Sequence, residues 1–170
     1  CHTASQQQAE RQHRTGQAAL DAWPPTCACS RFSAASRAAR GQLRLVGSDA
    51  AAAFETLMPV DVIGLGVGKQ RYGLLLNDEG GIMDDLMFVN TGDDLFVIVN
   101  GACKAADIAH IQNRIGQRCR IELMPDWALL ALQGPKAADA LARLAPGVKK
   151  LVFMTGGAFD WNGVQLYATR

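Results

Sequence analysis

The chain has 170 residues, of which 49% are hydrophobic, and its formal net charge is +1. This size and composition fit one globular domain, or one domain with part of another, and they exclude a chain that is disordered throughout. The near-neutral charge gives no electrostatic footprint for nucleic acid, and the longest apolar runs, such as 96–99, are far too short to cross a membrane.

The first 40 residues differ in composition from the rest of the chain. They are rich in Ala, Ser, Gln and Arg, contain no Lys, and have only Glu10 and Asp21 as acids. No helical or strand period is sustained through them. We therefore expect residues 1–40 to be an atypical leader, disordered or read out of frame, and residues 41–170 to form the folded region.

Five cysteines are scattered along the chain, at positions 1, 27, 29, 103 and 119. An odd number at such spacing does not make a disulfide framework, which favours a reducing compartment. Cys27 and Cys29 have no second Cys or His pair at ligand spacing, so we predict no metal site. Cys103 precedes a predicted helix whose dipole would lower the pKa of the thiol, but no base lies beside it in the sequence.

Regular structure begins at Gly41. Residues 41–47 predict a strand, and residues 49–58 predict a helix with Ser48 as its N-cap and Pro59 after its end. That helix carries three large hydrophobic residues at core spacing, Phe54, Leu57 and Met58.

Three strands and two turns follow in short succession. Strands are predicted over 69–76, 82–90 and 95–100, and the turns over 77–81 and 91–94 contain Gly, Asn and Asp residues, which tolerate positive φ. Because consecutive strands joined by short turns pair with reversed direction, this segment predicts an antiparallel meander.

A helix and two further strands come next. The helix is predicted over 102–116, with Gly116 at its end, and the strands over 119–124 and 127–134. The expected buried face of this helix is formed by Ala105, Ile108, Ile111 and Ile115.

The C-terminal part predicts one more helix and a hairpin. The helix begins at Gly134 and Pro135, and its expected core face is formed by Ala138, Leu141 and Ala145. Residues 151–170 predict two strands around a turn at 160–163. Because strands pair mainly with neighbouring strands and helices are interposed, the predicted fold class is α+β with antiparallel strands, rather than a doubly wound parallel sheet.

Two adjacent acids, Asp84 and Asp85, lie within the predicted strand 82–90. Successive side chains of a strand point to opposite faces, so Asp85 shares its face with Met83 and Met87. Asp84 shares the other face with three hydrophobic residues, Ile82, Leu86 and Phe88. One carboxylate must therefore face inward, where it needs a partner, a hydrogen bond or a ligand, and periodicity does not decide which one.

The alternative interpretation is that the acidic pair caps a loop at the end of a hairpin. This interpretation is favoured for a second pair, Asp93 and Asp94, because that pair lies in a predicted turn. For Asp84 and Asp85 the residues alone leave both interpretations open.

Several segments of the chain, in order, resemble one enzyme family. They are LLLNDEGGIMDDLMFVNTGDDLFVIVNGACKAADIAHI, DWALLALQGPKAADAL and FMTGGAF, and the similarity runs from about Gly41 to Arg170. The family is the aminomethyltransferase, or T-protein, of the glycine cleavage system. The resemblance implies a folate-binding α+β fold that transfers a one-carbon unit from an aminomethyl-lipoyl group to tetrahydrofolate and releases ammonia. It also implies the lipoyl-bearing H-protein as partner, in the cytoplasm of a bacterium or the mitochondrial matrix of a eukaryote.

The resemblance assigns roles to three residues, and a fourth, Tyr72, is a candidate because it lies on the strand that precedes the aspartate strand. The family's catalytic aspartate is the second of the pair in GGIMDDL, which is Asp85, and Asp84 is left with a structural role. A positioned carboxylate can orient the folate amine and stabilise the positive charge that develops on the transferred carbon. Asn100 matches an asparagine near the folate, and an N-cap of the next helix is its alternative role. Tyr72 is expected to flank the same pocket or, alternatively, to be an ordinary packed side chain.

Two segments depart from the family pattern. Before Gly41 the family has a segment like Phe-Asp-Val-Ser-His-Met, where this chain has SRFSAASRAAR. After Arg170 the family continues into a segment like Gly-Tyr-Thr-Gly-Glu-Asp-Gly and then supplies further folate contacts. We therefore expect this chain to be a fragment with little or no activity by itself, because catalysis depends on holding the reacting groups in place.

Two other functions stay open at this point. One is a non-catalytic folate-binding relative involved in iron–sulfur cluster maintenance, although the Lys-Gly-Cys-Tyr-type motif of those relatives is absent here. The match in LNDEGGIMDDL favours the transferase over that relative. The other is a structural or interaction module with solvated acids, which a folate titration separates from both.

Overall fold

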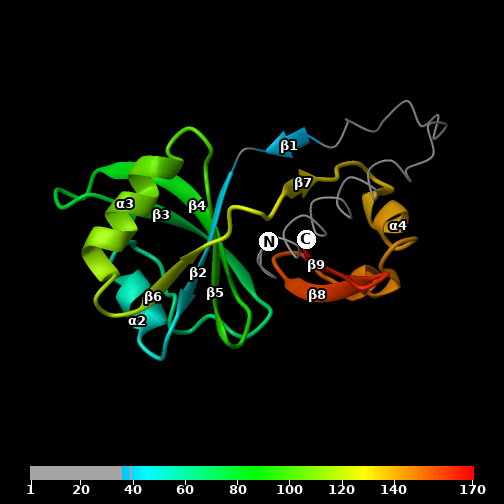
Figure 1. Cartoon of the computed structure of the whole chain (residues 1–170), viewed down its shortest axis with the longest axis horizontal. Helices are drawn as coiled ribbons and strands as arrows, with labels where there is room; N and C mark the ends of the chain where they lie inside the picture. The colour runs from blue at the N-terminus through cyan, green and yellow to red at the C-terminus, as the bar shows by residue number, and fades with distance from the viewer. Residues whose placement is uncertain (1–35, 39) are drawn as a thin grey trace, which may run out of the picture.

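The computed structural model describes residues 36–38 and 40–170. Most of the expected leader lies outside the described residues, and so do three cysteines, Cys1, Cys27 and Cys29. Figure 1 shows two helices, α2 (Ala50–Glu55) and α3 (Lys104–Ile115), against one face of a sheet, with a smaller group of strands and helices beyond it. No helix of the described residues is long and apolar enough to cross a membrane.

The central sheet has five strands in the order β3-β4-β5-β2-β6. They are β2 (Gly41–Val46), β3 (Gln70–Leu76), β4 (Ile82–Asn90), β5 (Asp94–Val99) and β6 (Arg120–Leu123). The predicted meander is confirmed as β3-β4-β5. The α+β fold class is confirmed as well, because every neighbouring pair in this sheet is antiparallel.

Both predicted turns of the meander are present. Between β3 and β4, the N–H of Asn77 donates to the carbonyl oxygen of Gly81 at 2.9 Å, and Gly80 has a φ of 77°. Between β4 and β5, the N–H of Thr91 donates to the carbonyl oxygen of Asp94 at 3.0 Å. Gly80 is suited to its position because glycine adopts positive φ at little steric cost.

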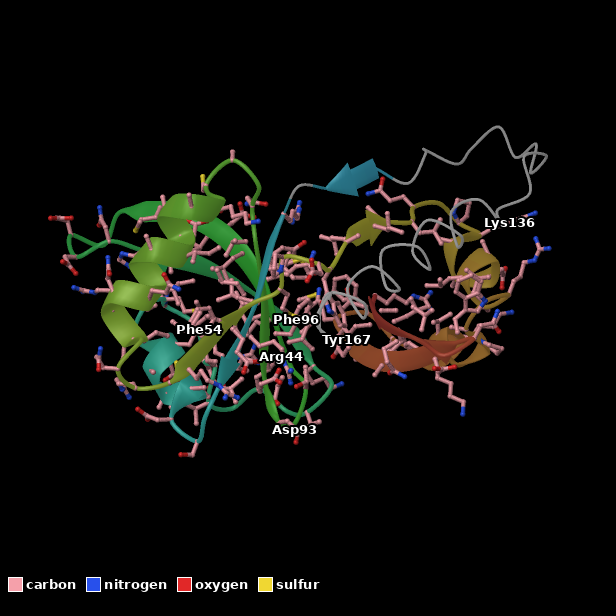
Figure 2. The ribbon with its side chains drawn as sticks, in the orientation of Figure 1. Arg44, Phe54, Asp93, Phe96, Lys136 and Tyr167 are labelled. Carbon is pink, nitrogen blue, oxygen red and sulfur yellow. The ribbon has the colours of Figure 1, made fainter. Side chains whose placement is uncertain are left out.

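The prediction of Asp94 as a turn acid is wrong. Asp94 is the first residue of β5 and is buried, and its carboxylate accepts hydrogen bonds from Arg44 and from the Thr91 hydroxyl, the latter at 2.9 Å. Arg44 lies within reach because β2 pairs with β5. The neighbouring Asp93 is exposed at the tip of the turn, as predicted (Figure 2).

Helix α2 lies within the predicted range, but Ser48 does not cap it. The N-cap residue is Asp49, which makes no side-chain cap hydrogen bond. Its carboxylate instead pairs with Arg118 at 2.7 Å. After Glu55 the chain continues in tighter turns, since the N–H groups of 56–58 bond to the third residue before each.

Helix α3 buries a polar residue that its predicted hydrophobic face does not include. Its buried positions are Asp107, Ile111 and Ile115, whereas Ala105 is exposed. Ile111 lies six positions after Ala105, so the two side chains point about 120° apart around the helix axis. Asp107, four residues before Ile111, lies on the buried side instead.

The main core fills the space between the sheet and the two helices. Its largest fully buried side chains include Phe54, Phe88, Leu43, Leu45, Leu75, Leu86, Ile111 and Ile115. The Phe54 ring meets the Phe88 ring edge to face, with 5.6 Å between centroids. Leu57 and Met58 are buried as predicted. Fully burying a side chain of this kind contributes about 1.5–3 kcal/mol, so this core holds β4 and α3 firmly together.

Shorter elements form the smaller group. β1 (Ser36–Ala38) pairs with β7 (Leu129–Ala131), and α4 (Ala137–Leu141) is followed by the 3₁₀ helix η1 (Pro146–Lys150). The core face predicted for the helix that begins at residue 134 is only partly confirmed. Ala145 is buried, but Ala138 and Leu141 are half-buried.

The predicted hairpin near the C-terminus is confirmed. β8 (Gly156–Trp161) pairs with β9 (Val164–Thr169) in antiparallel register. The two residues between them, Asn162 and Gly163, have φ of 52° and 79°. Two consecutive positive φ angles match the twist of a two-residue hairpin turn.

A second hydrophobic cluster joins this hairpin to the sheet face opposite the two helices. It contains Val89, Phe96 and Ile98, with Met124, Leu129 and Tyr167 packed against them. The rings of Phe96 on β5 and Tyr167 on β9 lie near each other in Figure 2, and their centroids are 5.7 Å apart. These contacts cover only part of that face, and on β3 they leave Tyr72 exposed over 56% of its surface.

Candidate functional site

Asp84 and Asp85 lie on opposite faces of β4, as the pleat predicts. Asp84 pairs with the fully buried Leu75 and lies on the face that packs against α3. Asp85 pairs with Leu74 and is exposed on the other face. The structure therefore decides what periodicity leaves open, because Asp84 is the inward carboxylate and Asp85 is the accessible one.

A β-bulge in β4 precedes the two acids. Leu75 pairs with Asp84, but the next residue, Leu76, pairs with Ile82, so Met83 is an extra residue in the ladder. Met83 packs against the main core rather than beside Asp85, and Ile82 is 66% exposed rather than on the core face. The positions of Met83 and Ile82 both differ from the prediction, because the bulge interrupts the strict alternation of side chains along β4.

Asn100 follows β5 and lies opposite Asp85. Met87 pairs with Ile98 in the ladder between β4 and β5, so the same register brings residue 85 opposite residue 100. The Nδ2 group of Asn100 donates to the main-chain oxygen of Asp85 at 2.8 Å and to its Oδ1 at 3.1 Å. It also donates to Oδ1 of Asp84 at 3.0 Å. One amide therefore connects both adjacent carboxylates.

Tyr72 and Leu74 of β3 lie on the same face as Asp85. Leu74 is directly opposite Asp85 and Tyr72 is opposite Met87, so Tyr72 lies diagonally across from Asp85. Tyr72 is 56% exposed and Leu74 is 38% exposed, so the alternative that Tyr72 is an ordinary packed side chain is wrong. We call Tyr72, Leu74, Asp85 and Asn100 the open-face site. It brings together the three site residues that the sequence predicts.

The structure adds one acid that the sequence prediction does not include, Asp107 of α3. This residue is 1% exposed, and its carboxyl hydrogen-bonds the carboxyl of Asp84. Burial, followed by the hydrogen bond and the charge of Asp84, raises the pKa of Asp107 to about 7. The signal in the sequence is its spacing, since Asp107 lies on the same side of the helix as the buried Ile111 and Ile115.

The electrostatic setting of Asp84 is opposite to that of Asp107. Burial alone raises the pKa of Asp84, but hydrogen bonds from Asn100, Asp107 and two backbone amides outweigh it and lower that pKa overall. Below about pH 7 the pair therefore holds an ionised Asp84 against a carboxyl that keeps its proton.

Cys103 lies beside this carboxyl pair, at the N-cap position of α3. The negative charge of Asp84, burial and the charge of Asp107 raise the pKa of the Cys103 thiol. The predicted lowering by the helix dipole is therefore wrong, because two nearby acids oppose it. The alternative role of Asn100 as the N-cap is also wrong, since Cys103 occupies that position.

The open-face site offers groups that suit a flat, N–H-rich ligand. Asp85 presents a carboxylate acceptor, and Tyr72 presents a ring face and a hydroxyl. The side-chain hydrogen bonds of Asn100 within the described chain all use Nδ2, so its Oδ1 is available as a second acceptor. Over the same residues, no group of three or more His, Cys, Asp or Glu side chains is arranged to hold a metal ion.

Known proteins share the segment that builds this site. A model of the GCVT N-terminal domain family matches residues 36–170. The mitochondrial aminomethyltransferase of Dictyostelium discoideum is 32% identical over 140 residues, which are 76% of this chain and 35% of that protein. The mitochondrial aminomethyltransferase of Homo sapiens is 37% identical over 131 residues, which are 72% of this chain and 32% of that protein.

A solved structure shows the same fold. The glycine cleavage system aminomethyltransferase T from Bartonella henselae matches with a TM-score of 0.64 and 33% identity, over 70% of this chain and 33% of that chain. The chain thus spans about a third of the length of the curated relatives it matches. The resemblance to the glycine-cleavage aminomethyltransferases is confirmed, and because the family match covers most of its residues, the chain belongs to the GCVT N-terminal domain family.

Proposed function

We propose that this protein transfers a one-carbon unit from an aminomethyl-lipoyl group on H-protein to tetrahydrofolate, with release of ammonia, and that Asp85 is its catalytic residue. The observation that carries the proposal is the open-face site, an exposed carboxylate held by Asn100 and diagonal to Tyr72. The relatives named above are aminomethyltransferases, which supports this activity over another folate reaction.

Asp85 is suited to positioning and electrostatic stabilisation. Its Oδ1 accepts a hydrogen bond from Asn100 at 3.1 Å, which orients the carboxylate and leaves Oδ2 for a substrate amine. Positive charge develops on the carbon as its bonds to the carrier sulfur and to the departing ammonia break and bonds to folate nitrogen form. A preorganised anion beside the carbon stabilises this charge, and holding the amine in line removes part of the entropic cost.

Tetrahydrofolate, as the second substrate, supplies that amine, and its pterin ring fits the groups present. The ring carries N–H donors along its edge, for which Asp85 and the Oδ1 of Asn100 are acceptors. Tyr72 offers an exposed aromatic face for the ring to lie against, and Leu74 adds exposed apolar surface beside it.

A single-turnover assay tests the proposal. The full chain is mixed at high concentration with H-protein that carries aminomethyl-lipoyl groups, with and without tetrahydrofolate, and ammonia is measured. We expect ammonia release that depends on tetrahydrofolate but is slow, as predicted for a chain that spans about a third of the length of the relatives it matches. Asp85→Asn should slow it roughly 100-fold, because it removes a preorganised charge aimed at the reacting carbon.

Asp93→Asn is the matched control for this assay. Asp93 is an exposed acid in the turn before β5, at the opposite end of that strand from Asn100 (Figure 2). Asp93→Asn should keep the wild-type rate of ammonia release. Full folate-dependent release by Asp85→Asn would show that Asp85 is not the catalytic residue.

Asp84→Asn should lose less turnover than Asp85→Asn. The Asp84 carboxyl lies on the core side of β4 and contacts the open-face site through the amide of Asn100, at 3.0 Å. An equal or larger loss in an Asp84→Asn protein that folds normally would reverse the roles of the two acids.

A tetrahydrofolate titration separates the remaining functions. Saturable binding without any ammonia release would indicate the non-catalytic folate-binding relative of iron–sulfur cluster maintenance. Absence of both binding and release would indicate a structural or interaction module.

A further inference from the structure

A carboxyl pair beneath the open-face site has no part in the proposed transfer itself. We propose that Asp107 is a positioning residue: it holds one proton between its carboxyl and that of Asp84, and so fixes the Asn100 amide with Nδ2 toward Asp85 and Oδ1 toward the open face. The ligand contact of that Oδ1 rests on the proposed function, whereas the shared proton and the orientation of the amide do not.

The pair needs a proton because two buried oxygens have no other donor. Among the described residues, Oδ2 of Asp84 and Oδ2 of Asp107 are buried, and no N–H or O–H group of another residue donates to either oxygen. An ionised carboxylate can only accept, so the hydrogen bond between the two carboxyls requires a proton on one of them. One proton placed between the pair therefore satisfies both groups.

Asp107 is the member that carries the proton. At 1% exposure it is more deeply buried than Asp84, which is only half-buried, and burial penalises the charged form most strongly there. The pKa of Asp107 is raised to about 7, first by burial and then by Asp84. Two carboxyls in contact rarely ionise together, so the lowered pKa of Asp84 and the raised pKa of Asp107 agree with one shared proton.

The ionised Asp84 in turn fixes the side chain of Asn100. Its Oδ1 accepts from Nδ2 at 3.0 Å, beside the two oxygens of Asp85 that accept from the same group. An Asn100 amide turned over would place its own oxygen against these three acceptors, with no donor between them. Only one orientation satisfies the network, and it directs the carbonyl oxygen of Asn100 away from β4.

The titratable groups near Asp107 include Asp84 of β4, which faces it directly. Along α3 itself, Cys103 and Lys104 lie about one turn before Asp107, and His110 lies about one turn after it. The charge of Asp84 faces Asp107 directly, so ionisation of Asp107 would repel Asp84 from its place beside the amide. The hydrogen bonds of the amide are therefore expected to loosen as pH rises through about 7.

The side-chain amide of Asn100 reports this network without any ligand. In the ¹⁵N-labelled full chain its signals are assigned by their loss in Asn100→Ser and followed from about pH 5 to about pH 9 by NMR. We expect a step with a midpoint of about 7 in the wild-type protein. Asp107→Asn should show no step, because its amide donates to Asp84 at every pH.

Two control variants isolate the origin of the step. His110 lies about one turn after Asp107 on α3, so His110→Gln must keep the step if Asp107 causes it. Asp139 is the matched acid in the first turn of α4, where it is exposed, and Asp139→Asn should also keep the step.

The single-turnover assay supplies the second readout. The wild-type rate should fall as pH rises above about 7, and Asp107→Asn should lack this decline and keep the rate measured at lower pH. Asp107→Ala removes the donor altogether and should slow turnover on the order of 10-fold at every pH, because a small displacement at a reacting centre is costly.

The outcomes separate this proposal from the proposed function. A flat Asn100 signal in the wild-type protein, or an unchanged step in Asp107→Asn, would overturn the positioning role even if ammonia is released as expected. If the step behaves as expected while the wild-type protein releases no ammonia, the transfer function fails and the positioning of Asn100 stands.

Discussion

Three acids of one hydrogen-bond network differ in the surroundings that the fold gives them. Asp85 is exposed on the open-face site, Asp84 is ionised within a hydrogen-bond network, and Asp107 is buried against it with its pKa raised to about 7 by burial and by Asp84. The pleat of a strand is enough to separate the first two. Asp107 could not be predicted with them, because its surroundings come from a strand that meets α3 only in the folded protein.

The free energy of unfolding should depend on pH because of Asp107. Its pKa is about 7 in the folded state against an ordinary value of 3.8, so the folded state binds this proton more tightly. The stabilisation is complete below about pH 4 and is lost as pH rises to about 7. Urea unfolding should therefore show that the advantage of the wild-type protein over Asp107→Asn shrinks between about pH 5 and about pH 8. An advantage that stays constant over this range would contradict the raised pKa.

Elements bounded by clear turn residues were the ones that could be predicted best. β3, β4 and β5 follow their predicted ranges closely, because the Gly, Asn and Asp residues between them fix the turns locally. The errors arise where a distant element supplies the partner. Arg118 takes the carboxylate of Asp49, and Arg44 of β2 draws Asp94 into β5. The sequence around each acid does not show which distant residue will be its partner.

The ion pair between β2 and β5 gives a test at the scale of elements. Asp94→Ala removes a buried carboxylate and leaves Arg44 and the Thr91 hydroxyl without their acceptor. We expect the free energy of unfolding to fall by about 2 kcal/mol, the usual range for hydrogen bonds to a charged group beside a partly exposed arginine. Urea denaturation measures this loss. The exposed neighbour Asp93 is the control, and a loss of similar size in Asp93→Ala would contradict the assignment.

The whole molecule places its core on one sheet face and its candidate site on the other. The antiparallel α+β class follows from local patterns, but the position of β2 between β5 and β6 does not, because it depends on pairs far apart in the sequence. The family match begins at residue 36, where β1 pairs with β7. The prediction of an atypical leader concerns mainly residues outside the described ranges, and it stays a prediction.

The central claim is that tetrahydrofolate binds on the face that presents Asp85, rather than on the helix-covered face. A titration of tetrahydrofolate into the ¹⁵N-labelled full chain, followed by NMR, tests this most directly. We predict saturable shifts at Tyr72, at Asp85 and at the side-chain amide of Asn100, with the outer surface of α3 unaffected. Binding that shifts residues of α2 and α3 and leaves those three unchanged would contradict the account, and so would the absence of any shift at saturating tetrahydrofolate.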